Sequence, residues 1–433
     1  MLMKCPFNLP LLLAVALGSA LTLPAKSQEI PATAEATNTL TLAHAIELAQ
    51  ADNPEIRVLS ADIASARGEV TTAKTWQNPE ISVTPGFKTV RDQSDTQFHG
   101  DFGLEQTFAW PGKRALQQAL AEKSVTVRQL ALDGFRAQLA ILVRRAFFTL
   151  LAAREEVTLR EQRLTLAKTF VAAAQKKVEG GYAPEFEATK ATVEVVAAQK
   201  ALRGAQARHA AAQVALNALM GRNPTTPLAL AGTLEDRLEL PDLSSLLAQS
   251  LRQNPGLKIR VAEAERAGLN LQTIRQSRLP DFKVGPGLEY TRDEQIVGIG
   301  VTLPLPFWDQ KKGEIATATA CQAKALAELN QLRRDILSQV TTASLNLVAA
   351  RESLTFYTPA LRAQLQAALV AAEEGYAAGR TPLWLYLEAQ RTCFDTQADY
   401  FDTLQNTFAA QAELESAVGL PLPQLSQPAT ETK

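Results

Sequence analysis

Apolar and polar residues alternate with the two-residue period of a β-strand in two regions of the chain. Ile81, Val83, Pro85 and Phe87 alternate with polar residues, and a second such run follows a polar turn at 91–97. The pattern returns 201 residues later, so strands are predicted at about 79–90, 98–109, 280–291 and 295–303. Each strand has the length of a tilted strand that crosses a bilayer. Each pair predicts a hairpin with one apolar and one polar face, the polar faces carrying His99, Asp101, Glu105, Lys283 and Glu289.

Long helical patterns follow both hairpins. Residues 113–179 contain no proline and place apolar or small residues three and four apart, which predicts one heptad-patterned helix roughly 100 Å long at about 1.5 Å per residue. The same pattern predicts a second long helix at 311–378, kinked at Pro359. Glycine-containing turns end both helices, and prolines open return helices at 184–220 and 382–418. Before the first hairpin, Thr41 to Trp76 predicts two helices or one bent helix.

The chain is predicted to be an internal duplication. Asn53–Pro54 recurs as Asn254–Pro255 and Pro85–Gly86 as Pro286–Gly287, both 201 residues apart. We expect one copy at 28–220, a proline-rich connector at 221–241, a second copy at 242–419 and a tail at 420–433. Near the helix ends, Gly181, Tyr182 and Ala183 match Gly375, Tyr376 and Ala377 at a spacing of 194, whereas the following prolines are 198 apart. This change of spacing predicts two tips that differ in length by four residues.

The N-terminus predicts an export signal over 1–27. Lys4 precedes an apolar run from Leu9 to Leu23, which ends in small residues. Cys5 precedes this run, so it is not expected to carry a lipid anchor. No later stretch reaches 18 uninterrupted apolar residues, and any membrane crossing is therefore expected to use strands.

Composition narrows the function classes. The chain has 44 basic and 45 acidic residues, a balance that argues against nucleic-acid binding. It lacks a glycine-rich phosphate loop and a nucleophile elbow, so no enzyme, catalytic residue or cofactor is predicted. The three histidines, His44, His99 and His209, lie on separate segments without zinc-ligand spacing, so no metal site is predicted. Cys321 and Cys393 are expected to be buried small residues.

Four membrane strands cannot form a closed sheet within one chain. Unpaired strand edges in lipid cost several kcal/mol per polar group, so copies of the chain are expected to share one barrel. Two copies give eight strands and a filled interior, whereas three give twelve strands and begin to leave a lumen.

The ordered features resemble those of TolC-type outer-membrane efflux proteins. They are the proline-bounded hairpins, the run Pro111–Arg114, the Gly-Tyr-Ala turns and the stretch from Gly379 to Thr392. Asn53–Glu55 and Gly112–Arg114 are most similar to the heavy-metal cation-efflux, CzcC-like branch.

The resemblance implies a mainly α-helical homotrimer. Its twelve strands would form an outer-membrane β-barrel in the lipid, and its helices a coiled-coil tunnel, with most of the mass in the periplasm. A periplasmic membrane-fusion adaptor and an inner-membrane resistance-nodulation-division pump would be its partners, and heavy-metal cations its cargo. Drug or solvent efflux and protein secretion are alternatives on this fold. A periplasmic coiled-coil adaptor is the alternative of another class, although such adaptors have one helical hairpin and lack strands of membrane length.

Two groups of residues are the candidate sites. The tips are expected to contact the adaptor and to close the tunnel, unless their glycines only turn the chain; these residues are Glu179, Gly180, Gly181, Tyr182, Ala183, Glu374, Gly375, Tyr376, Ala377, Arg380 and Thr381. Aromatic residues flank the strand ends and are expected to form a membrane-interface belt, with ordinary packing as the alternative; they are Trp76, Trp110, Phe307 and Trp308.

Overall fold

The computed structural model describes residues 39–422 except 90–95, 233, 235–241 and 292–293. All of these fall within one compact unit, Thr39–Lys433. The predicted export signal at 1–27, most of the first hairpin turn, part of the connector and the tail after residue 422 lie outside the described residues.

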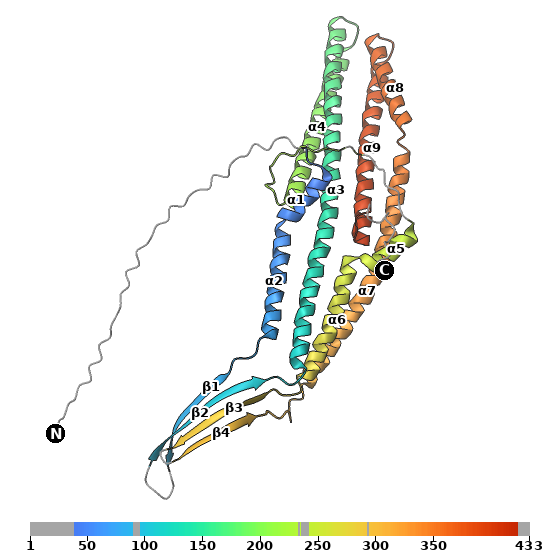
Figure 1. Ribbon diagram of the computed structural model, residues 1–433. Helices are drawn as coiled ribbons and strands as arrows, with labels where there is room; N and C mark the ends of the chain where they lie inside the picture. Colours follow the sequence, from blue (N-terminus) through green and yellow to red (C-terminus); the bar gives the residue numbers. More distant parts are fainter. Residues whose placement is uncertain (1–38, 90–95, 233, 235–241, 292–293, 423–433) are drawn as a thin grey trace, which may run out of the picture. The chain divides into compact units, whose positions relative to one another are not determined.

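Two successive sets of elements follow the same order, helices, hairpin and long helices (Figure 1). The first set comprises α1 (Leu42–Asp52), α2 (Pro54–Lys74), β1 (Glu80–Thr89), β2 (Thr96–Phe108), α3 (Lys113–Glu179) and α4 (Glu185–Leu219). The second comprises α5 (Leu243–Gln253), α6 (Pro255–Gln276), β3 (Phe282–Thr291), β4 (Gln295–Thr302), α7 (Lys312–Thr355), α8 (Pro359–Ala377) and α9 (Leu383–Val418). α3 has the predicted bounds, and each strand begins and ends within two residues of its prediction.

The four strands form one antiparallel sheet in the order β1-β2-β3-β4. Pairing of β2 with β3 joins the hairpins and sets Phe102 opposite Leu288 and Asp101 opposite Glu289. Because side chains alternate between faces, apolar and polar residues separate as the sequence predicts. The apolar face is exposed to solvent, as shown by Ile299, which is 79% exposed. In the described chain β1 and β4 each pair with one strand, so both edges of the sheet are open.

The second long helix is broken rather than continuous. The sequence predicts a kinked helix at 311–378, but α7 ends at Thr355 and α8 begins at Pro359. Proline has no backbone N–H to continue the helix. Thr358 instead caps a new one, its hydroxyl accepting a hydrogen bond from the Leu361 amide at 3.1 Å. α3 continues without a break along the corresponding stretch.

The expectation of tips that differ by four residues is wrong. Gly181 and Gly379 both adopt the left-handed conformation, with φ of 74° and 72°, and they are 198 residues apart. Pro184 and Pro382 precede α4 and α9 at the same spacing. Gly375, Tyr376 and Ala377, matched in sequence to the first turn, still belong to α8. The left-handed glycine, not the Gly-Tyr-Ala triplet, marks the equivalent position, and the two turns have equal length.

Two equivalent asparagines hold the short helices against the return helices. Asn53 caps α2 and donates from Nδ2 to the Leu219 carbonyl at 2.9 Å, while Asn254 caps α6 and donates to the Ala417 carbonyl at 3.0 Å. Around these contacts lie two apolar cores, one formed by α1 to α4 and the other by α5, α6, α7 and α9.

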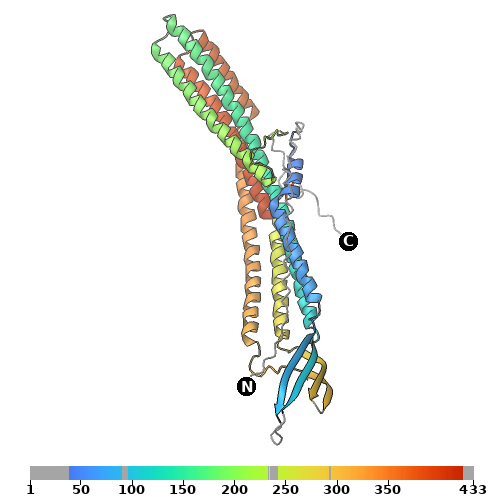
Figure 2. The ribbon, with the colours of Figure 1, turned by 90° about the vertical axis from the view of Figure 1, so that its left-hand side faces the viewer.

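α3 packs along α2, α4, α6 and α9 and so joins the two halves (Figure 2). None of the helices in the described part of the chain is long and apolar enough to cross a membrane.

Candidate functional site

The two turns form the ends of the helical hairpins, opposite the sheet (Figures 1 and 2). Most of the predicted tip residues are exposed there: Glu179, Gly180, Gly181, Tyr182, Glu374, Ala377 and Arg380. Ala183 and Thr381 are half-buried. Gly375 and Tyr376, in contrast, are buried, so the predicted set divides into an outer surface and an inner contact.

Tyr376 is the centre of that inner contact. Its hydroxyl donates a hydrogen bond to Glu187 Oε2 on α4 at 2.9 Å. Lys177 of α3 donates from Nζ to the Tyr376 carbonyl, and the same ammonium lies 3.6 Å from the centre of the tyrosine ring. One residue of the second hairpin therefore contacts both helices of the first through charge-assisted and cation–π contacts.

An aromatic cluster lies behind this contact. The Tyr376 ring stacks on Tyr386 of α9 with 5.6 Å between centroids, and Phe170 of α3 lies 5.3 Å from Tyr376 and 4.9 Å from Tyr386. Gly375 lets the chain approach closely here, because a β-carbon at this position would overlap the Thr381 hydroxyl. The tip is thus a packed junction of all four helices.

Burial raises the pKa of the Tyr376 hydroxyl, and the hydrogen bond to Glu187 and the charge of that carboxylate raise it further. Burial likewise raises the pKa of Tyr386. The Tyr376 hydroxyl is therefore fully protonated, and donates its hydrogen bond to Glu187, below the ordinary tyrosine pKa of about 10. This donation is lost as the pH rises through the raised pKa of Tyr376.

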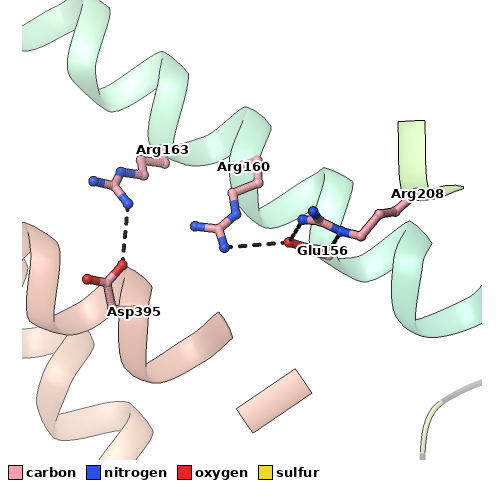
Figure 3. Close-up of polar contacts among 5 residues, drawn as sticks. All are labelled: Glu156, Arg160, Arg163, Arg208 and Asp395. Atoms are coloured by element: carbon pink, nitrogen blue, oxygen red, sulfur yellow. Dashed lines mark hydrogen bonds and ion pairs between the residues drawn. The ribbon is translucent and has the colours of Figure 1, made fainter. Parts of the chain in front are cut away.

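Ion pairs connect the same helices between the tips and the sheet (Figure 3). Arg163 of α3 lies 2.7 Å from Glu194 of α4 and 3.4 Å from Asp395 of α9. Glu156 lies between Arg160 of its own helix and Arg208 of α4, at 3.5 and 2.5 Å. The hydrogen bond to Glu156 raises the pKa of Arg208. Both groups fasten α3 to its neighbours.

The predicted belt residues all lie where strands meet helices. Trp76 precedes β1 and packs against Phe108 with 6.0 Å between ring centroids, and Arg114 covers its ring at 3.9 Å. Trp110 follows β2 and is half-buried. Phe307 and Trp308 lie between β4 and α7, with Trp308 95% exposed. Trp76 and Trp110 therefore combine local packing with their position beside the sheet, whereas Trp308 is almost fully exposed and meets the Phe307 ring edge to face with 6.1 Å between centroids.

The polar face of the sheet carries two groups of charges. Near the helices, Lys283 of β3 pairs with Glu80 of β1 and, at 3.8 Å, with Glu105 of β2. Farther along, His99, Asp101 and Glu289 bring one nitrogen and two carboxylate oxygens within 4.8 Å of one another. His99 has no zinc-ligand spacing to another histidine or cysteine in the sequence, but strand pairing brings it beside two acids.

Sequence reasoning missed the partners of Tyr376. Lys177 and Glu187 lie one turn from the predicted turn on either side, and Phe170 and Tyr386 occupy ordinary apolar helix positions. In the sequence, only the closeness of Lys177 and Glu187 to the turn indicated that they could contact Tyr376. The expectation of two buried cysteines is half wrong: Cys393 is buried, and burial raises its pKa, whereas Cys321 is exposed.

The outer membrane efflux protein family matches residues 45–222 and 246–420. The cobalt-zinc-cadmium resistance protein CzcC of Cupriavidus metallidurans is 28% identical over 89% of this chain and 91% of its own. The nickel and cobalt resistance protein CnrC of the same organism is 28% identical over 67% of this chain and 71% of its own.

Solved structures share the fold. A crystal structure of CusC superposes with a TM-score of 0.73 at 16% identity, covering 88% of this chain and 92% of that one. The outer-membrane channel OprN gives a TM-score of 0.74 at 16% identity, with 87% and 89% covered. The expectation of an outer-membrane efflux protein rather than an enzyme is confirmed. With its bare four-stranded sheet and its pair of long helical hairpins, the chain belongs to the outer membrane efflux protein family.

Proposed function

We propose that this protein is the outer-membrane channel of a tripartite efflux system that exports divalent heavy-metal cations. In this proposal three copies form a twelve-stranded barrel continued by a helical tunnel, and each copy is a duplicated unit. The observation that carries it is the sheet, which has a bare apolar face and two open edges beside long helical hairpins.

The open edges support sharing of the barrel. β1 and β4 each present unpaired backbone groups, and lipid offers such groups no hydrogen-bond partner. Joining β4 of one copy to β1 of the next satisfies them. Exposed apolar residues also line the outer helices, among them Phe186, Val193 and Val196 on α4 and Leu345 and Val348 on α7. Neighbouring copies would cover these faces.

The belt residues support the position of the membrane. Trp76, Trp110, Phe307 and Trp308 lie at one end of the strands, where aromatic rings favour the lipid interface. The strands then cross the lipid and the helices extend into the periplasm.

The tips are proposed to be both the gate and the adaptor contact. Parting the hairpins would break the contacts of Tyr376 with Lys177 and Glu187, so these contacts favour the closed state. The exposed residues Glu179, Tyr182 and Arg380 remain available to a periplasmic adaptor, which would couple the channel to an inner-membrane, proton-driven pump.

The metal-resistance relatives support a metal cargo. A deletion strain challenged with cobalt, zinc, cadmium, copper and a drug panel tests this. Sensitivity to metals alone, restored by the gene in trans, supports the proposal. Sensitivity to drugs alone identifies the alternative cargo. Fractionation provides the separate test of architecture: the protein should enter the outer membrane as a heat-resistant trimer, and a soluble monomer overturns the proposal.

A further inference from the structure

We propose that His99, Asp101 and Glu289 form a binding site for a divalent transition-metal cation on the polar face of the sheet. The site itself rests on sheet geometry. Its position inside the channel rests on the proposed barrel.

The strand register brings the three side chains together. His99 and Asp101 are two residues apart on β2 and therefore share a face, and Asp101 is directly opposite Glu289 of β3. The Nε2 atom of His99 lies 3.2 Å from Asp101 Oδ1, and Nδ1 lies 3.9 Å from Glu289 Oε1. Ligand atoms around a tetrahedral zinc ion are about 3.3 Å apart, given bonds of about 2.0 Å. One ligand atom from each residue lies within 4.8 Å of the other two, so these separations must shorten when an ion binds.

The charges of this group are uncompensated, unlike those of its neighbours. Glu80 and Glu105 on the same face both pair with the ammonium of Lys283. Among the described residues, neither Asp101 nor Glu289 forms an ion pair with a lysine or arginine. Like charges directly opposite across two strands are destabilising. A bound cation would offset this repulsion.

The histidine supplies a second observation. Its Nδ1 atom is shielded from solvent and has no hydrogen-bond partner in the described part of the chain. A buried polar atom without a partner is costly. A metal ion bound at Nδ1 would satisfy it, and Asp101 and Glu289 would each supply a carboxylate oxygen; one ligand atom from each of the three residues lies within 4.8 Å of the others.

The surroundings leave room for an ion. Gly86 is paired with His99 on one side, while Gly103 and Gly287 follow the acids on the same face. No side chain from these three positions can cover the group. The side chains of His99, Asp101 and Glu289 are 25%, 51% and 44% exposed, so the site is accessible from the polar side.

The donor set defines the class of ion. One imidazole nitrogen with two carboxylate oxygens suits zinc, cobalt or nickel, whereas calcium and magnesium prefer oxygen alone and copper(I) prefers sulfur. Three protein ligands leave positions open to water. Conduction requires a site that releases its ion, and open positions give an incoming ligand access to the metal. Three copies of the chain would form a ring of such sites.

Direct binding tests the site. Mature protein without a histidine tag, purified in detergent, is dialysed against Zn²⁺ in excess Mg²⁺, and bound zinc is measured by mass spectrometry. We expect one Zn²⁺ per chain, lost in His99→Ala and in Glu289→Gln. His44→Ala is the matched control, because His44 also lies near one carboxylate, Glu47 at 3.7 Å, but on a helix without a third ligand. The visible spectrum of bound Co²⁺ should change in the same two variants, and trimer yield on a gel verifies their folding.

The outcomes separate the site from the proposed function. Equal zinc in wild type and His99→Ala, or an equal loss in His44→Ala, overturns the site. Wild type that binds no zinc yet restores metal resistance overturns the site and leaves the channel function. Wild type that binds zinc yet does not restore resistance leaves the site and overturns the proposed cargo.

Discussion

The hydroxyl of Tyr376 on α8 donates a hydrogen bond to the carboxylate of Glu187 on α4, with 2.9 Å between the two oxygens. The two residues are 189 positions apart in the chain and belong to different halves. Their contact lies between the ends of the two helical hairpins, so separation of the hairpins requires its rupture.

Replacing Tyr376 with Phe should loosen the tips. The ring and its stacking on Tyr386 are kept, while each copy of the chain loses a hydrogen bond to a carboxylate worth about 1.5–3 kcal/mol, so the ratio of open to closed channels should rise at least about tenfold. Single-channel recording in planar bilayers measures this ratio. Tyr182→Phe is the matched control, because Tyr182 lies at the other tip and is 88% exposed. An equal open probability in wild type and Tyr376→Phe refutes the gate assignment.

Gly375→Ala should destabilise the same junction by overpacking. The added methyl would overlap the Thr381 hydroxyl, and inserted methyl groups in packed regions cost about 1–3 kcal/mol. We expect a lower thermal midpoint and a partial recovery when Thr381→Ala removes the hydroxyl. Gly313→Ala serves as the control, since nothing lies within 4 Å of the added atom. A Gly375→Ala protein as stable as Gly313→Ala would contradict the close approach.

Arg144→Met should destabilise the junction of the two halves. Arg144 of α3 lies 2.7 Å from Glu415 of α9, a fully buried carboxylate that also accepts hydrogen bonds from Gln411 and from the Leu422 amide. Removing one partner of a buried pair costs about 3–5 kcal/mol. Thermal unfolding in detergent measures the loss, and Glu415→Gln in the same chain should recover part of it.

An exposed ion pair on the same helix provides the comparison. Arg128 lies 3.4 Å from Asp62, and both side chains are well exposed. Surface ion pairs contribute about 0–1 kcal/mol to the free energy of unfolding, so Arg128→Met should lower the thermal midpoint very little. If Arg144→Met and Arg128→Met lower the thermal midpoint equally, Glu415 is not held by a buried pair.

Val83→Lys should block assembly, whereas Thr84→Lys should not. These neighbours on β1 point to opposite faces of the sheet, Val83 to the apolar face and Thr84 to the polar face. A lysine in contact with lipid costs about 2–4 kcal/mol at the bilayer midplane, but one in a water-filled lumen does not. The amount of heat-resistant trimer in outer-membrane fractions is the readout. Equal yields for both variants would remove the lipid-facing assignment.

The sequence predicted the strands and α3 closely because periodicity reports local backbone geometry. Residues 113–179 keep one heptad pattern without proline, and the helix has those bounds. Sequence matching failed at the tips, where Gly375–Tyr376–Ala377 copies a turn but lies within a helix. The same three residue types can adopt different backbone conformations, so the triplet does not identify the turn. The turn is identified by its left-handed glycine, Gly181 in the first tip and Gly379 in the second.

The functional contacts were less predictable because they depend on segments far apart in the chain. Tyr376 was a candidate by its place near the tip, but Glu187 and Lys177 became partners only through packing of the hairpins. His99 and Glu289 are brought together by the pairing of β2 with β3. Periodicity gives the face on which each residue lies, not the register between hairpins.

Cellular metal content tests the central claim most directly. Cells that lack the gene, cells that carry it and cells that carry the Val83→Lys variant are exposed to cobalt and zinc, and accumulated metal is measured by mass spectrometry. The proposed export function predicts more metal in the deletion strain and in the Val83→Lys strain than in cells with the intact gene. Equal metal content in all three strains would contradict it.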